Sequence, residues 1–326
     1  MPGSSPLRHA LLLCLVLLTQ ALPAGQRLGT PLRLHEDGRV IERHMGIRLL
    51  GALVLSGRPE LAELSDLAWD QDEQLLYAVS DRGLLLHLEP VFENQRLVDA
   101  VLHHVYPLRD GRGKSLSGSS ADAEGLALEN GDNGIRGDSR LNVSFERKHR
   151  IARYTTDGKL IGKLRLPADL RDPDFYRGHN KGLEALVLQP VFGFLSAPEK
   201  PREGYTIPIY SISRGERWHY TPAVSYGALV AMENYRNDSL LVLERAYESM
   251  LDPLVITLSL LPISATNRES TPRPLRIASF DSTRGWLTQN FEGLARHQGD
   301  RYFMVSDDNG EPFLQTQLLY FEVAPE

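Results

Sequence analysis

The segment Ala123-Glu124-Gly125-Leu126-Ala127 places a glutamate directly before a small, apolar run. Related segments share this order of a carboxylate followed by small or apolar residues: Leu64-Ser65-Asp66-Leu67-Ala68, Gly182-Leu183-Glu184-Ala185-Leu186 and Phe291-Glu292-Gly293-Leu294-Ala295. A degenerate copy, Ala231-Met232-Glu233, follows Tyr226-Gly227-Ala228-Leu229. The carboxylates recur about every 50 to 60 residues, and self-similarity at such a period indicates a repeat architecture.

A second carboxylate follows each copy, at the end of the next apolar run. These are found in Val79-Ser80-Asp81, Val143-Ser144-Phe145-Glu146, Leu195-Ser196-Ala197-Pro198-Glu199, Leu241-Val242-Leu243-Glu244 and Val305-Ser306-Asp307. The repeating unit is therefore carboxylate, strand, turn, strand, carboxylate. A third strand often follows, as in Arg150 to Tyr154.

The rest of the chain also favours short strands over helices. Apolar runs of four to seven residues, such as Leu75 to Ser80 and Val255 to Leu261, alternate with clusters of Gly, Asp, Asn, Pro and Ser. This pattern predicts an all-β fold, a β-propeller with blades of three to four antiparallel strands. Five repeats are visible, and pairing Val40 to Leu55 with Gln317 to Val323 would add a sixth blade that closes the ring.

In a propeller the innermost strands line the central axis, so equivalent residues of successive blades converge there. The repeated carboxylates are therefore expected to form a ring. The alternative is that they cap turns on the solvent side, where Asp is common. A Glu followed by Gly-Leu-Ala is harder to explain as a turn cap.

The N-terminus has the features of a secretory signal peptide. Arg8 and His9 precede the apolar run Ala10 to Leu18, and small residues follow, which predicts a signal over residues 1–24 and a single domain over 25–326. The run is too short to cross a bilayer comfortably, so we expect a secreted or periplasmic protein with no membrane span. The only cysteine, Cys14, lies within this signal, which excludes a thiol nucleophile from the mature chain. The net charge of −6 gives no general attraction to nucleic acid.

The order of these motifs resembles the phytase-like family described as "esterase-like activity of phytase". The resemblance runs through Asp122 to Ala127, Phe145-Glu146-Arg147, Asn180 to Leu186, Leu243-Glu244-Arg245, Asn290 to Ala295 and Ser306-Asp307-Asp308-Asn309. It covers most of the chain from about Leu49 onwards. It implies a secreted bacterial propeller related in architecture to calcium-dependent phytases and lactonase-type propellers.

Several carboxylates that converge must be protonated, paired or bound to metal. Calcium takes six to eight oxygen ligands, and the repeats offer only oxygen ligands. The expected metal ligands are Glu124, Glu184, Glu292, Glu199, Asp307 and Asn309. In particular, Glu124, Glu184 and Glu292 are expected to share one site. The alternative is an ion-pair ring, in which an arginine that follows a carboxylate pairs with an acid of the next blade.

Catalysis by a covalent serine has little support, because the chain has no Gly-x-Ser-x-Gly segment. The expected catalytic residues are Glu146 and Glu244 as acid-base groups, with Arg147 and Arg245 holding phosphate oxygens. Other candidate bases are His149, His179 and His219. Two functions remain open: a calcium-dependent hydrolase of a phosphate ester, ester or lactone, acting as a monomer, or a non-catalytic binding or scaffold propeller with a structural metal.

Overall fold

The computed structural model describes residues 26–178, 181–247 and 252–324. The predicted signal peptide and His179 lie outside the described residues. Among those that are described, no helix is long and apolar enough to cross a membrane. The one α-helix in this part of the chain is the single turn α1 (Ala168–Arg171).

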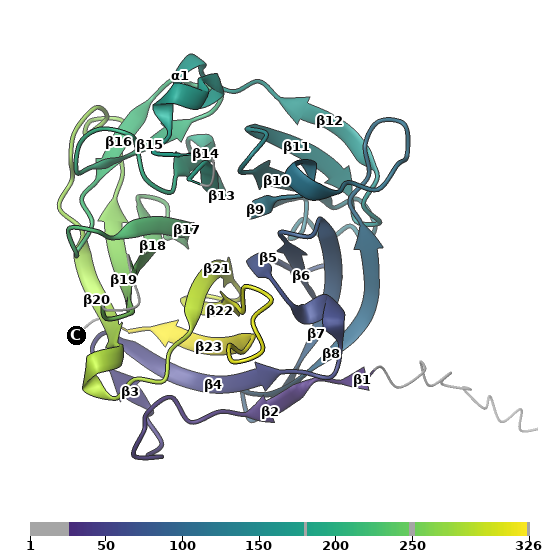
Figure 1. Cartoon of the computed structure of the whole chain (residues 1–326), viewed down its shortest axis with the longest axis vertical. Helices are drawn as coiled ribbons and strands as arrows, with labels where there is room; N and C mark the ends of the chain where they lie inside the picture. The colour runs from purple at the N-terminus through teal and green to yellow at the C-terminus, as the bar shows by residue number, and fades with distance from the viewer. Residues whose placement is uncertain (1–25, 179–180, 248–251, 325–326) are drawn as a thin grey trace, which may run out of the picture.

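The strands form five antiparallel sheets arranged around a central axis (Figure 1). Blade one consists of β5 (Leu64–Asp70), β6 (Leu75–Ser80), β7 (Leu84–Glu93), β8 (Arg96–Pro107) and β1 (Gln26–Arg27). Blade two consists of β9 (Ala123–Glu129), β10 (Arg140–Phe145), β11 (Arg150–Thr155) and β12 (Leu160–Leu164). Blade three consists of β13 (Leu183–Gln189), β14 (Gly193–Pro198), β15 (Ile207–Ser211) and β16 (Arg217–Tyr220).

Blade four consists of β17 (Ala228–Tyr235), β18 (Ser239–Ala246), β19 (Val255–Pro262) and β20 (Leu275–Asp281). Blade five consists of β21 (Asn290–Arg296), β22 (Arg301–Asp307), β23 (Gln317–Val323), β4 (Ile47–Leu55), β2 (Gly29–Pro31) and β3 (Arg43–His44). The all-β propeller prediction is confirmed, but the number of blades is five and not six.

The predicted pairing of the two ends of the chain is present, in a different blade from the one expected. β4 pairs with β23 from Ile47 to Val54. β23 is itself the third strand of the blade that begins with β21, so β4 completes that fifth blade and adds no sixth. The early strands β1 and β2 lie on the outer edges of blades one and five, and therefore link the two blades at which the ring closes.

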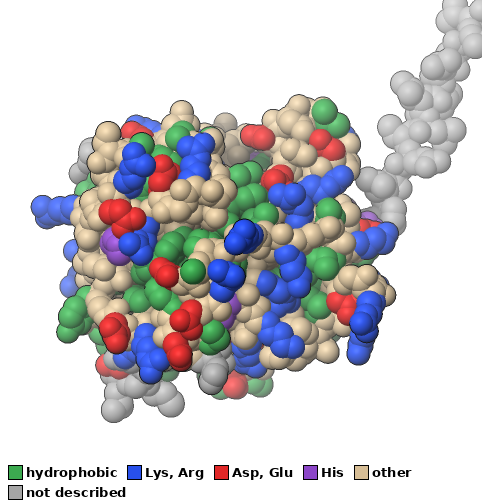
Figure 2. Space-filling view, turned by 90° about the horizontal axis from the view of Figure 1, so that it is seen from above, with side chains coloured by type: hydrophobic (Ala, Val, Ile, Leu, Met, Phe, Trp, Pro, Cys, Tyr) green, Lys and Arg blue, Asp and Glu red, His purple; other side chains and the backbone are tan. Residues whose placement is uncertain are grey.

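Five clusters of buried apolar residues hold the ring together, one between each pair of neighbouring blades. Each cluster takes side chains from facing sheets, as Leu67 of blade one and Phe303 of blade five do. The strands are therefore apolar on both faces, and polar side chains remain for the strand ends and the outer rim. Figure 2 shows acidic and basic side chains interspersed on the rim that is seen from above.

Candidate functional site

A β-bulge recurs in the inner strand of every blade. In β5, Leu64 pairs with Ser80 and Asp66 with Val79, so Ser65 is an extra residue without a partner. The same shift in register occurs near the start of each of the other four inner strands. The bulge residues that correspond in the five blades are Ser65, Glu124, Glu184, Val230 and Glu292. Bulges redirect a side chain, and three of these five residues are glutamates.

The residue after the bulge lies where neighbouring inner strands approach closely. A Cβ on Gly293 would lie 2.7 Å from the Cα of Asp66 in the next blade, and one on Gly125 would collide with the carbonyl oxygen of Glu184. This close approach explains the Glu-Gly-Leu order at two of the repeats. In blade one the same position holds Asp66, whose carboxylate accepts hydrogen bonds from the backbone N–H of Leu126 (2.7 Å) and Leu294 (2.9 Å).

A second set of equivalent positions lies at the end of the second strand of each blade. In each blade, the residue just before the bulge pairs with a residue of the second strand, and the member of this set comes directly after that partner. In blade one, for example, Leu64 pairs with Ser80, and Asp81 follows Ser80. The set comprises Asp81, Glu146, Glu199, Arg245 and Asp307. Because antiparallel neighbours begin and end on the same side, both sets lie on one face of the ring. Blade four is the one blade with an acid in neither set, since it carries Val230 and the cation Arg245.

We name these acids, with Asp122, the acidic cluster: Asp81, Asp122, Glu124, Glu146, Glu184, Glu199, Glu292 and Asp307. Within it, two groups bring their carboxylate oxygens within 4.8 Å of one another. The first group is Asp81, Asp122 and Glu124, from blades one and two. The second is Glu146, Glu184 and Glu199, from blades two and three.

Arg245 is the cation of the cluster, and its side chain is only 17% exposed. Its guanidinium forms an ion pair with Glu292 of blade five and another, at 2.9 Å, with Glu199 of blade three. It also donates to the Asn290 side chain at 2.5 Å. An ion pair between an arginine and acids of the adjoining blades was the alternative to metal binding, and at Arg245 it is confirmed. Lys181 contacts the other oxygen of Glu199 at 2.7 Å.

The remaining acids have fewer partners of opposite charge. Asp122 contacts Arg147 at 3.0 Å, while Asp81 accepts a hydrogen bond from the Ser65 hydroxyl at 2.5 Å. Glu146 accepts from the backbone N–H of Gly182 at 3.3 Å. Among the residues that the structure describes, eight carboxylates therefore lie near three paired cations, Arg245, Lys181 and Arg147. The excess negative charge requires protons or a bound cation.

Burial and mutual repulsion raise the pKa of most of these carboxyls. Burial raises the pKa of Asp81 to about 7, and the nearby Glu292 adds to the effect. Burial likewise raises the pKa of Glu146 to about 8 and that of Asp307 to about 9. For Glu124 and Glu184 the pKa lies well above its ordinary value, because burial is reinforced by neighbouring acids.

Some of the residues expected at the site lie elsewhere. Glu244 pairs with Leu229 and comes one residue before Arg245, the member of the second set in blade four. Its carboxylate accepts hydrogen bonds from the Tyr220 hydroxyl (2.7 Å) and from the backbone N–H groups of Ala223 and Val224. It therefore anchors the loop that leads into β17. Asn309 is exposed in a turn, where its backbone N–H donates to Asp307 at 2.7 Å.

The degenerate repeat and His219 also lie apart from the cluster, whereas His149 lies at its edge. The ring of His149 stacks on Tyr176 at 4.0 Å between centroids and lies close to Glu146, since a Cβ on Gly182 would be 2.8 Å from His149 Cε1 and 2.9 Å from Glu146 Cγ. His219 lies in β16, the outer strand of blade three. Glu233 lies near the far end of β17 and lines a 530 Å³ cavity together with Arg296. The same cavity is lined by ends of the other inner strands, so it opens on the face opposite the acidic cluster.

Three parts of the site were not expected from the sequence. Asp81 and Asp122 join Glu124, although neither was expected to bind metal, and the residue of blade one that corresponds to Glu124 is Ser65 and not Asp66. For Asp81 the signal was present, since it ends the second strand of its repeat as Glu146 does. The two groups of three carboxylates contain only oxygen donors, which fit calcium and not zinc.

Comparison with known sequences decides the family. The sequence model of the family described as "Phytase-like: Esterase-like activity of phytase" matches residues 59–310. These residues include all five inner strands and the whole acidic cluster. The chain belongs to the phytase-like family. No curated protein gave a significant match to the chain.

The phytase-like chain also has distant similarity to solved propeller structures. The WD40 domain of Neurospora crassa Pan2 is 10% identical and has a TM-score of 0.44, with 88% of this chain and 98% of that chain covered. The RRP9 WD40 repeats are 9% identical with a TM-score of 0.43, covering 85% and 100% of the two chains. U3-55K is 10% identical with a TM-score of 0.38, covering 84% and 98%.

Proposed function

We propose that this phytase-like protein is an exported hydrolase that uses a calcium-type cation, held by the acidic cluster, to cleave an ester bond of an anionic substrate. The observation that supports it most is the pair of carboxylate groups, each with three oxygens within 4.8 Å, on the face where the two sets of equivalent positions converge. Such a density of acids is costly without a counter-charge, and a divalent cation outside the cell would supply one.

In this proposal the cation is held by Asp81, Asp122 and Glu124, by Glu146, Glu184 and Glu199, or by both groups. A bound calcium would polarise a phosphoryl or carbonyl oxygen and lower the pKa of a bound water. Among the chain's own groups, Lys181 is well placed to bind a substrate anion, because its side chain is 40% exposed beside the buried Glu199. Arg245 would fix the position of Glu199 and Glu292, and Arg147 that of Asp122.

The loops around the cluster favour an anionic substrate. The segments that lead into β13, join β14 to β15 and lead into β17 all lie on the face of the cluster. They line a 500 Å³ pocket that contains Arg177, Arg202, Tyr205 and Tyr226. Two arginines and two tyrosines suit a phosphate ester, whose oxygens accept hydrogen bonds from guanidinium and hydroxyl groups. A carboxylic ester or a lactone would make less use of these cations.

The test is a hydrolase panel on the purified protein, with calcium and with chelator. We expect turnover of phytate or p-nitrophenyl phosphate with calcium and loss of that turnover with chelator. The panel should include p-nitrophenyl acetate and a lactone to distinguish the ester class. Glu124→Gln and Glu184→Gln should each abolish the activity. The control is Glu129→Gln, which should leave the activity unchanged, because Glu129 lies at the other end of β9 from Glu124 and pairs with Arg153 on the opposite face. Activity that persists equally in chelator would refute the role of the metal.

A second candidate is a non-catalytic propeller with a structural metal. The ion pairs of Arg245 and Lys181 with Glu199 favour it, because they stabilise part of the cluster internally. The two candidates differ in one result. A structural metal would raise the melting temperature with no turnover of any panel substrate, while the hydrolase would show both.

Export and a monomeric state are part of the same proposal. A signal over residues 1–24 would be removed on export, and intact-mass measurement of the exported protein should then show a chain that begins near Gly25. A mass that includes Met1 would contradict this. Light scattering of the purified protein should give the mass of one chain.

A further inference from the structure

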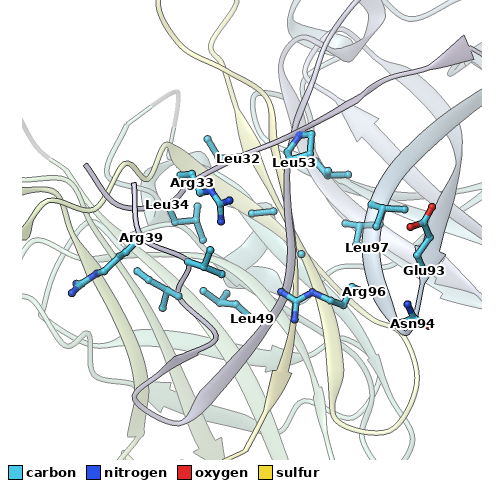
Figure 3. A pocket seen from close by; sticks show the side chains of 16 residues that line it. Leu32, Arg33, Leu34, Arg39, Leu49, Leu53, Glu93, Asn94, Arg96 and Leu97 are labelled. Atoms are coloured by element: carbon cyan, nitrogen blue, oxygen red, sulfur yellow. The ribbon is translucent and has the colours of Figure 1, made fainter. Parts of the chain in front are cut away.

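A further pocket lies on the outer rim of the propeller, where blades five and one meet (Figure 3). Its volume is 370 Å³, within the range of about 300–1,000 Å³ that small-molecule sites occupy. One wall comes from β4, from the last residue of β2 and from the segment 32–41 that follows β2. The other comes from the ends of β7 and β8. It is therefore remote from the acidic cluster, which lies on the axis.

The fold leaves this space because two short strands cover only the ends of β4. β2 pairs with Leu53 to Leu55, and β3 pairs with Ile47 and Arg48. Between them the backbone of Gly51 approaches blade one so closely that a Cβ would lie 2.6 Å from the carbonyl oxygen of Leu97. The segment between β2 and β3 bends away from β4 and is held by the loop that follows β20. The backbone N–H of Glu36 donates to the Gly285 carbonyl, and the backbone N–H of Leu287 donates to the Leu34 carbonyl.

The floor of the pocket is apolar. It consists of the buried side chains of Leu34, Leu49, Leu53 and Leu97. Val40 lies at the edge and is 58% exposed. A ligand with an aliphatic chain would therefore remove its own apolar surface, and that of the exposed Val40, from water, which stabilises binding by about 25 cal/mol per Å².

The rim is basic. Arg33, Arg39 and Arg96 line the pocket together with one acid, Glu93. In Figure 3 the guanidinium groups of Arg33 and Arg96 point toward the space between the leucines, whereas Arg39 points away. Arg39 pairs with Asp37 at 3.4 Å. The guanidinium groups of Arg33 and Arg96 form no ion pair or hydrogen bond with any residue that the structure describes.

An added β-strand does not fit this groove. The edge of β4 that faces it is already engaged, because Leu49 N–H donates to the Glu42 carbonyl at 2.8 Å and the Ala52 carbonyl accepts from Leu32 N–H at 2.9 Å. Strand addition requires a free ladder of backbone groups, and here those groups are used. The donors that remain are the two guanidinium groups, which bind carboxylates in a bidentate manner.

We propose that this rim pocket binds a free, single-chain amphiphile with a carboxylate head, such as a medium-chain fatty acid. The aliphatic chain lies on the four leucines, and the carboxylate lies between Arg33 and Arg96. This site is independent of the proposed hydrolase function, since no residue of the acidic cluster takes part in it.

Isothermal titration of the purified protein tests the proposal with three probes. Decanoate carries both features, decanol only the chain, and butyrate only the charge. We expect saturable binding of one decanoate per chain, with decanol and butyrate each at least about tenfold weaker, a difference of about 1.4 kcal/mol. Equal affinity for decanol, or no saturable binding of decanoate, would overturn the proposal.

Variants then locate the site. Arg33→Gln with Arg96→Gln should reduce decanoate binding to the level of decanol. Val40→Asp places a negative charge at an exposed edge position without disturbing the core, and should abolish decanoate binding. Arg284→Gln, a matched change at a side chain that is 80% exposed on another loop, should leave it unchanged. Melting curves check that each variant is folded.

A membrane lipid is the competing source of an anionic amphiphile. Sedimentation with phosphatidylglycerol vesicles separates the two, because the free ligand should bind without recruiting the protein to vesicles. Vesicle binding that depends on Arg33 and Arg96, in the absence of decanoate binding, would overturn the proposal. Unchanged decanoate binding in the Val40→Asp variant would do the same.

Discussion

Arg245→Met should lower the free energy of unfolding by more than the loss of an exposed ion pair would. Arg245 is mostly buried and contacts Glu199, whose side chain is 2% exposed, and Glu292, which is 14% exposed. Removing one partner from a buried ion pair typically costs about 3–5 kcal/mol, because the other charge stays buried. The lower end applies here, since Lys181 still contacts Glu199 and Asn290 still donates to Glu292.

A loss of about 3 kcal/mol corresponds to a fall in melting temperature of about 6–12 °C for a chain of 150–250 residues, and to the lower end for a longer chain. The measurement is a thermal melt at pH 7.5 in chelator, supported by urea unfolding. Arg136→Met is the matched control. Arg136 pairs with Glu73 but is 73% exposed, and an exposed pair is worth less than about 1 kcal/mol.

The reasoning also predicts partial rescue. Glu292→Gln in the Arg245→Met background removes one of the charges that was left unpaired, so the double variant should be more stable than Arg245→Met alone. If Arg245→Met melts with the wild-type protein, or falls no further than Arg136→Met, the buried ion pair is not what holds blades three, four and five together at the axis.

Three further outcomes are expected. Calcium at a hundredfold excess over its dissociation constant should raise the free energy of unfolding by about 2.7 kcal/mol, and Glu124→Gln should reduce this gain; equal melting curves in calcium and chelator would contradict it. Glu244→Gln should cost about 1–3 kcal/mol through its hydrogen bonds from Tyr220 and the backbone, with the calcium response unchanged in thermal melts. Burial lowers the pKa of His297 to about 4, so below about pH 6.5 the unfolded chain binds more protons and stability falls as the pH drops toward 4. Because the ring is only partly buried, we expect this contribution to the free energy of unfolding to be about 1–2 kcal/mol, and a melting series from pH 4 to 7 should show it absent in His297→Phe.

The propeller was predictable because its signal is repeated and therefore redundant. Short apolar runs and carboxylates at a constant period gave the all-β class and the blade repeat without any single motif being decisive. The number of blades was not predictable, because the pairing of two strands does not by itself show to which blade the pair belongs. The sequence pattern of Gln317 to Val323 is equally consistent with the third strand of one blade and with the start of another. The structure shows β23 paired with β22.

The site was only partly predictable, because its geometry depends on bulges. The sequence pattern, in which acid corresponds to acid, aligned Asp66 with Glu124 and Glu244 with Glu146. The strand register aligns Ser65 and Arg245 with them instead. A shift of one residue turns a side chain to the other face of the strand, so an alignment error of one position exchanges a site residue for a structural one. A bulge has no side-chain signature of its own that could have corrected it.

The corrected register gives blade four a distinct role. In the other blades one or both equivalent positions hold an acid, whereas blade four presents Val230 and Arg245. A complete ring of acids would contain no fixed positive charge to hold the carboxylates in place, and each carboxylate would be free to take a proton. Arg245 instead binds Glu199 on one side and Glu292 on the other, so it holds acids of both adjoining blades in place and leaves Asp81, Asp122 and Glu124, on the opposite side of the ring, without a share of its charge. That asymmetry favours a bound cation at the group from blades one and two over a cation shared by Glu124, Glu184 and Glu292. The partner of Asp122 is Arg147, whose side chain is 44% exposed, whereas the partner of Glu292 is the mostly buried Arg245, which compensates its charge more strongly.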